Sequence, residues 1–175
     1  MIASLIVDMT LIQNKITLQK ACIDRINDVF DTCEQYFNTK FFKPRVVFNL
    51  RGNIAGRASY SQNLIKLNAQ LLIANGDKFV ADTPGHEAAH IVARIMFGCM
   101  IRPHGNEWAR VMNIINQPAN RCHNFEVKTK NVYSCSCPNE KHYLSTRRHN
   151  NILKGTHIYR CKNCKQNLVW INFAA

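Results

Sequence analysis

Apolar residues recur at steps of three and four in the first part of the chain. Between residues 16 and 37 the stripe consists of Leu18, Cys22, Ile26, Val29, Phe30, Cys33 and Phe37. This spacing predicts one amphipathic helix whose apolar face is buried, so that Cys22 and Cys33 are core residues. The helix must end before Pro44, because proline does not continue a helix.

Shorter patterns follow, with glycines between them. Alternating apolar and β-branched residues predict strands, and apolar residues at helical spacing followed by Gly76 and Gly98 predict helices that end there. In chain order we expect a strand at 45–50, two strands within 57–68, a short helix at 68–75, a helical region at 77–97 and a helix at 104–115.

The pattern changes after Gln117 to short basic segments bounded by cysteines. We therefore place a boundary near 118–130 and predict two domains, residues 1–125 and residues 126–175. Helices and strands mixed along the first domain indicate the α+β class.

Charge is distributed unevenly over the 175 residues, whose formal net charge is +12. Residues 121–175 contain 10 lysines and arginines against 2 acidic residues, which favours an anionic partner such as nucleic acid or an acidic membrane surface. No secretory signal is visible, and no segment approaches the ~20 apolar residues of a membrane span. We expect a cytoplasmic protein that does not enter a membrane.

The segment DTPGHEAAH at 82–90 contains two histidines at the spacing of one helical turn. His86 and His90 can therefore present both imidazoles to one zinc ion. Glu87 lies at the edge of the same face, where it could take a proton from the attacking water of a hydrolysis reaction. A catalytic zinc needs a third protein ligand, and the spacing leaves His104 and Glu107 as alternatives, with His123 a weaker one.

Pro84 and Gly85 stand directly before the first histidine. We favour a helix that begins here, with Thr83 as N-cap and Pro84 in the first turn. The alternative is a longer helix from Asp77 that Pro84 kinks. Gly85 removes a side chain next to His86, which would let substrate or a neighbouring strand approach closely.

Two close cysteine pairs lie in the basic region, Cys135 with Cys137 and Cys161 with Cys164. Two pairs joined by a hairpin-length insert are typical of a zinc ribbon, in which four thiolates close a tetrahedral structural site. Three histidines inside the insert could each replace a sulfur ligand: His142, His149 and His157.

Strand-like, basic flanks surround the cysteine pairs at 141–150 and 156–164. Cations interleaved with aromatic residues can bind phosphates and stack bases, although the aromatic side chains equally suit the small core of the ribbon. The candidate nucleic-acid contacts are Arg147, Arg148, Lys154, Arg160, Lys162 and Lys165.

Several blocks together resemble the SprT-like zinc proteins. In order they are GRASYSQNLIKLNAQLL, PGHEAAHIVARIMFG, PHGNEWARVM, RCHNFEV, YSCSCPNEKHYLSTRRHN and IYRCKNCKQNLV. The resemblance implies a zincin-like metalloprotease domain, with helices packed on a small mixed sheet and HExxH on its active-site helix, followed by a small β zinc ribbon. It also implies that His86, His90 and His104 bind the catalytic zinc, with Glu87 as general base. Gly85 and the small Ala88 depart from the family pattern beside the glutamate.

The related Spartan proteases cleave proteins crosslinked to DNA. By this resemblance we expect a zinc endopeptidase that acts on nucleic-acid-associated proteins, with two zinc ions per chain and a basic ribbon that assists DNA binding. The alternative is a non-catalytic, zinc-containing nucleic-acid-binding or transcription-associated protein. An intact Glu87 favours the enzyme, because a purely structural site has no need of an acid there. The protein substrate and the oligomeric state stay open.

Overall fold

The structure is a computed structural model that describes residues 2–122, 125 and 131–171. The chain divides into two compact units, unit 1 (Met1–Glu126) and unit 2 (Val127–Ala175).

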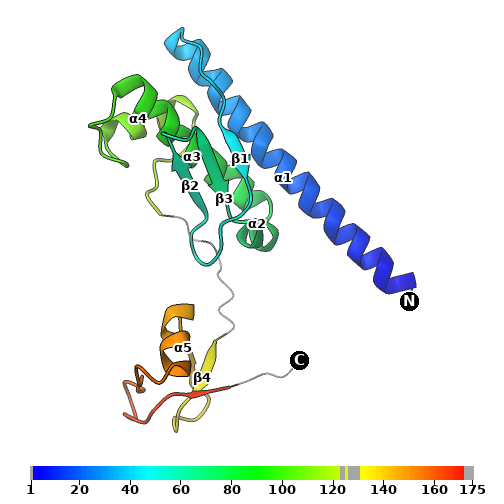
Figure 1. Cartoon of the computed structure of the whole chain (residues 1–175), viewed down its shortest axis with the longest axis vertical. Helices are drawn as coiled ribbons and strands as arrows, with labels where there is room; N and C mark the ends of the chain where they lie inside the picture. Colours follow the sequence, from blue (N-terminus) through cyan, green and yellow to red (C-terminus); the bar gives the residue numbers. More distant parts are fainter. Residues whose placement is uncertain (1, 123–124, 126–130, 172–175) are drawn as a thin grey trace. The chain divides into compact units, whose positions relative to one another are not determined.

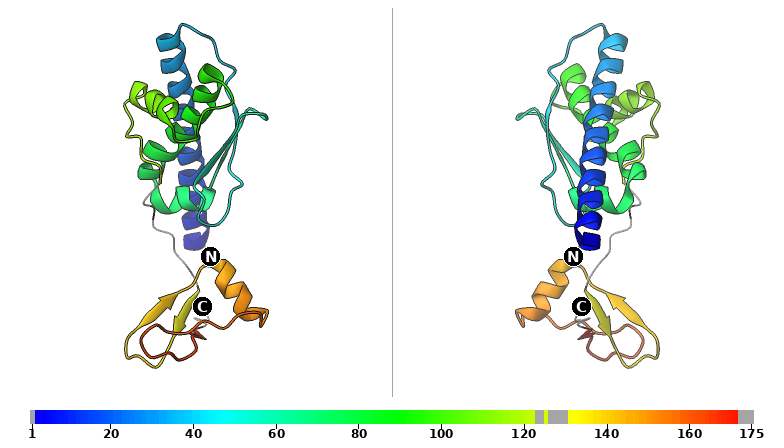
Figure 2. Two further views of the ribbon diagram at one scale, coloured as in Figure 1. Left: turned by 90° about the vertical axis from the view of Figure 1, so that its left-hand side faces the viewer. Right: turned by 90° about the vertical axis from the view of Figure 1, so that its right-hand side faces the viewer.

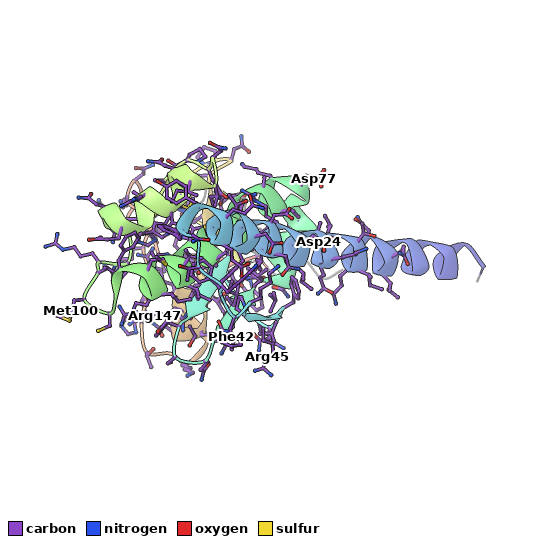
Figure 3. All side chains as sticks on the ribbon, turned by 90° about the horizontal axis from the view of Figure 1, so that it is seen from above. Asp24, Phe42, Arg45, Asp77, Met100 and Arg147 are labelled. Carbon is purple, nitrogen blue, oxygen red and sulfur yellow. The ribbon has the colours of Figure 1, made fainter. Side chains whose placement is uncertain are left out.

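Unit 1 begins with the long helix α1 (Ile2–Phe37), which starts well before the amphipathic stripe that predicted it. Its first turns extend past α2, the next helix of the chain (Figure 1, Figure 3). The predicted stripe is buried from Leu18 to Cys33, whereas Phe37 is half-buried. Cys22 and Cys33 are fully buried, as expected, and burial raises the pKa of the Cys22 thiol to about 12.

Three short strands form the sheet of unit 1: β1 (Arg45–Val47), β2 (Gly56–Ser59) and β3 (Leu64–Leu67). The strand order is β1-β3-β2, with β1 parallel and β2 antiparallel to β3, so the sheet is mixed. Leu64, Ile65 and Leu67 of the central strand are buried. β2 therefore forms one edge of the sheet.

Three further helices complete unit 1: α2 (Ala69–Asn75), α3 (Asp77–Phe97) and α4 (Asn106–Ile114). The Asn68 side chain caps α2 by accepting from the N–H groups of Gln70 and Leu71. α3 is the central element, because it packs against α1 and α4 and also against β2 and β3. The sheet lies on one side of the helices (Figure 2). Ala88, Ala89, Ile91, Val92 and Ala93 of α3 are all buried in this layer.

The favoured helix start at Thr83 is wrong, since α3 runs through Pro84 from Asp77. Gly76 precedes the helix, and its carbonyl accepts from the N–H groups of Phe79 and Val80. Thr83 therefore lies inside the helix, where its side chain is 3% exposed. Tertiary packing keeps the helix intact across a residue that removes one backbone donor.

Unit 2 contains β4 (Val132–Ser134), β5 (Lys141–Tyr143), α5 (Thr146–Leu153) and β6 (Val169–Trp170), with strand order β5-β4-β6. Tyr133 is fully buried at its centre and its hydroxyl contacts Nδ1 of His149 at 2.8 Å. The strand-like interpretation of 141–150 holds only for its first three residues. Ser145 then caps α5 by accepting from the Arg148 N–H, so the insert between the cysteine pairs contains a helix.

Helices and small sheets occur together in the described residues, which confirms the α+β class. None of the helices described here combines the length and the apolar character needed to cross a membrane.

Candidate functional site

Three imidazoles of unit 1 converge on one point. The Nε2 atoms of His86 and His104 lie 3.1 Å apart, and each lies 3.2 Å from Nε2 of His90. Tetrahedral zinc with Zn–N bonds of about 2.0–2.1 Å requires ligand nitrogens about 3.3–3.4 Å apart. The triangle of nitrogens therefore fits three ligands of one zinc ion.

Two elements bring these rings together. His86 and His90 lie one turn apart on α3, and His104 lies just before α4, in the turn closed by the Gly105 N–H bonding to the Arg102 carbonyl. The Trp108 ring lies 4.8 Å from His86, 5.5 Å from His90 and 4.8 Å from His104, centroid to centroid. This buried indole packs against all three rings and restrains their orientation.

The state of His90 suits a metal ligand. Burial, followed by the neighbouring His86 and His104, lowers the pKa of His90 to about 3, so the ring is neutral and has a lone pair to offer. The ring also bonds to the Pro103 carbonyl, and this contact orients it.

Glu87 lies between the histidine pair and the edge strand β2. Its side chain is 8% exposed, and the backbone N–H of Ala58 donates a hydrogen bond to its carboxylate. Burial raises the pKa of this carboxyl to about 7, and the Arg57 charge opposes the rise. Gly56 makes room for the carboxylate, because a Cβ there would lie 2.6 Å from Cγ of Glu87.

Gly85 meets a side chain rather than a strand. A Cβ on Gly85 would overlap the Oε1 atom of Gln117, a buried residue that follows α4. Gln117 donates to the Asp82 carbonyl at 2.6 Å and accepts from Nη2 of Arg25 at 3.3 Å. The glycine thus lets Gln117 join α1 to the segment of α3 just before His86, a contact that the sequence pattern did not indicate.

The histidines and Glu87 open into a cleft of about 880 Å³. It is lined by β2 with the residues on either side of it at 53–55 and 60–61, by α3, and by residues from the segments 101–104 and 121–122. Glu107 neither lines it nor belongs to the histidine cluster, and His123 lies outside the described residues. Among the described residues, the three-histidine group is therefore the one that can hold a metal ion in this unit.

In unit 2 the four predicted cysteines meet. The sulfur atoms of Cys135, Cys137, Cys161 and Cys164 all lie within 4.8 Å of one another, and those of Cys137 and Cys161 are 3.9 Å apart. A tetrahedral site with Zn–S bonds of about 2.3 Å requires sulfur atoms about 3.8 Å apart. In the metal-free chain the Gln166 backbone N–H lowers the pKa of the Cys164 thiol to about 7, whereas the hydrogen bond with Cys164 raises the pKa of the Cys137 thiol, so the first thiolate of the pair forms at Cys164.

The three histidines of the ribbon differ in their surroundings. Nε2 of His142 lies 3.2 Å from the Cys135 sulfur, and the two residues form a second possible ligand group with Glu140 and Cys161. His149 is instead buried against Tyr133, and His157 is exposed.

The six candidate nucleic-acid contacts are all exposed. Arg147 lies in the first turn of α5 and is labelled in Figure 3. The guanidinium carbon of Arg148 lies 5.7 Å from the centre of the Tyr159 ring. Tyr143 and Trp170 expose 62% and 40% of their surfaces, whereas Tyr133 belongs to the core. Tyr133 therefore serves the small core, and Tyr143 and Trp170 present part of their rings at the surface of this unit.

Comparison with known proteins gives matches to both units. The SprT-like family matches residues 26–131, and the SprT-like zinc ribbon domain matches residues 129–172. Protein SprT of Pseudomonas savastanoi pv. phaseolicola is 38% identical over 156 residues, which cover 84% of this chain and 94% of that protein. Protein SprT of Pseudomonas paraeruginosa is 40% identical over 152 residues, covering 83% and 92%. No solved structure matches the chain.

Proposed function

This chain belongs to the SprT-like family and carries the zinc ribbon domain of that family, and on this premise we propose that it is a zinc-dependent endopeptidase. One observation carries the proposal: three imidazole nitrogens converge beside a buried glutamate in an open cleft. HExxH on the active-site helix would make unit 1 zincin-like. A purely structural metal site has no need of a buried acid in this position.

Zinc bound by His86, His90 and His104 would supply a Lewis acid that polarises the peptide carbonyl and makes water more acidic. Glu87 accepts a proton from the attacking water and returns it to the amine nitrogen as the C–N bond breaks. In the metal-free chain burial raises the pKa of this carboxyl to about 7, and the charge of a bound zinc would lower it again, which favours the carboxylate that takes the proton.

The form of the cleft supports a peptide substrate. β2 is an edge strand and lines the cleft, so its backbone can pair with an extended chain. A cleft of about 880 Å³ accommodates several residues of such a chain.

The ribbon supports the second part of the proposal, a role at nucleic acid. Four thiolates would hold a structural zinc, which gives two zinc ions per chain. The exposed cations of α5 and of the cysteine loops, with Arg148 against Tyr159, suit phosphates and stacked bases. We propose proteins associated with DNA as substrates and the reducing cytoplasm as the compartment, where thiolate ligands and unpaired cysteines persist.

The decisive experiment compares the zinc-loaded chain with its Glu87→Gln variant in protein cleavage, with and without single-stranded DNA. We expect Glu87→Gln to lower kcat by roughly 10²- to 10⁴-fold while zinc content and helix signal stay unchanged. Equal cleavage by both proteins would remove Glu87 as the base. Absence of cleavage by either, together with salt-sensitive DNA binding by both, would favour the non-catalytic alternative.

A further inference from the structure

Three arginines surround the cleft of unit 1 without a carboxylate partner of their own. Arg57 comes from β2, Arg94 from α3 and Arg121 from the segment after α4. Within the described ranges, none of the three forms a salt bridge. The acidic residues that line the same cleft are Asp82 and the buried Glu87. The described lining therefore carries more positive than negative side chains.

Arg94 is the most constrained of the three. It follows His90 by one helical turn, so both side chains lie on the same face of α3. Its guanidinium carbon lies 6.0 Å from the centre of the Tyr60 ring, another residue of the cleft lining. Its Nε is buried and has no hydrogen-bond partner in the part of the chain that the structure describes. A buried N–H without an acceptor is costly, and a ligand that brings an acceptor recovers that cost.

Arg57 and Arg121 act from the two walls of the cleft. Arg57 lies close enough to Glu87, and Arg121 close enough to His104, for their charges to be felt by these groups. Positive charge therefore reaches both sides of the histidine cluster. These arginines therefore attract a negatively charged segment that enters the cleft, whichever side of the histidine cluster it approaches.

We infer that this cleft selects a peptide segment with an acidic side chain near the scissile bond, and that Arg94 binds its carboxylate. The inference rests on the proposed function and names its substrate class. A carboxylate matches Arg94 well, because Nε and one Nη of a guanidinium can donate two parallel hydrogen bonds to its two oxygens. The cation–π contact with Tyr60 restrains the guanidinium before the ligand arrives.

The test uses the zinc-loaded full chain and pairs of quenched peptides that differ only in Glu against Gln at one position around the cleaved bond. We expect kcat/KM to be about tenfold higher for the Glu peptide at one position. Arg94→Gln should bring that ratio close to one. The matched control is Arg110→Gln: Arg110 is exposed, lies outside the cleft and also stacks on a ring, 5.7 Å from the centre of Phe97. This control should retain the full preference.

A binding measurement separates this inference from the proposed function. Fluorescent Glu and Gln peptides are titrated into the Glu87→Gln variant with and without Arg94→Gln, and anisotropy gives the affinities. Tighter binding of the Glu peptide that is lost in Arg94→Gln supports the inference, whether or not the wild-type chain cleaves the peptide. Absence of cleavage would count against the proposed protease activity but not against this binding preference. Cleavage of both peptides at equal rates, with equal binding, would overturn the inference and leave the protease standing. Direct binding of a short oligonucleotide in competition with the Glu peptide, lost in Arg94→Gln but kept in Arg147→Glu with Lys154→Glu, would show that Arg94 binds phosphate and would overturn the peptide assignment.

Discussion

At the scale of single residues, two glycines set how closely other groups approach the helix that carries His86 and His90. Gly56 on β2 leaves space for the Glu87 carboxylate, and Gly85 on α3 leaves space for the Gln117 amide. In both positions an added Cβ would overlap a side chain that is itself buried. Substitution at either glycine therefore tests a specific contact rather than backbone flexibility.

Gly85→Ala should lower the free energy of unfolding by about 1–3 kcal/mol, because the new Cβ overlaps Oε1 of Gln117. The same substitution in a Gln117→Ala background should be neutral or stabilising, since alanine is favoured over glycine inside a helix by up to about 1 kcal/mol. Urea unfolding of the single and double variants measures this coupling. Equal costs in the two backgrounds would show that Gln117 is not the reason for the glycine.

Burial of Glu87 predicts how the metal-free protein responds to pH. The carboxyl pKa is raised to about 7 in the folded chain, against an ordinary value of 4.5, so the folded state holds this proton over that interval while the unfolded state releases it. Its contribution to stability is then full below pH 4.5 and is lost as the pH rises to about 7.

We therefore expect the free energy of unfolding of Glu87→Gln, relative to that of the wild-type chain, to increase by about 2–3 kcal/mol as the pH rises from 4.5 to 7. The measurement is urea unfolding of chelator-treated full-length protein, followed by the helix signal. His90 titrates in the opposite direction, but it is common to both proteins and cancels in the difference. A difference that does not change with pH would mean that Glu87 is not desolvated.

At the scale of helices and strands, periodicity predicted the elements better than their boundaries. The apolar stripe, the glycines and the alternating strands indicated the elements of unit 1 in the correct order. Predictions from local sequence preferences were wrong where tertiary packing outweighs those preferences. Pro84 is a helix start by preference, but contacts of α3 with α1, α4 and the sheet keep it inside a longer helix.

In the candidate site, too, local patterns indicated some features and tertiary packing determined the others. The spacing of His86 and His90 follows from helix geometry alone, and the family resemblance pointed to His104 over Glu107. The contacts of Gly56, Trp108 and Gln117 are long-range and depend on how the elements pack, so no local pattern indicated them. Trp108 lies within the helix expected at 104–115, but its contact with the three imidazoles was not predicted.

The ribbon offers two overlapping ligand groups, and the choice between them is testable. Cys135 and Cys161 belong to both, Cys137 only to the four-cysteine group, and His142 only to the group with Glu140. We expect Cys137→Ser to release the ribbon zinc and His142→Ala to retain it, because four sulfurs complete a closed tetrahedral site. Zinc per chain after dialysis gives the answer. Loss of the metal in His142→Ala with retention in Cys137→Ser would assign the site to the second group.

At the scale of the whole molecule, the two units should respond separately to loss of the ribbon metal. Unit 2 has a small core around Tyr133, so its fold depends on the proposed zinc. Cys135→Ser should unfold residues 131–170 and lower the zinc content from two ions to one, while unit 1 keeps its helix signal and its cleavage activity on free peptides. Hydrogen exchange read by mass spectrometry distinguishes the units. Loss of protection throughout α3 as well would contradict their independence.

Charge on unit 2 predicts how the chain binds DNA. Arg147→Glu with Lys154→Glu should weaken binding to single-stranded DNA and make the slope of log K against log salt shallower by about 2, since each lost phosphate contact releases about one counterion fewer. Lys15→Glu with Lys20→Glu changes the net charge equally, at exposed positions on α1 in unit 1. Because local contacts rather than net charge carry the proposed interaction, this control should keep the wild-type slope. Equal loss in both variants would show that DNA responds only to the overall charge.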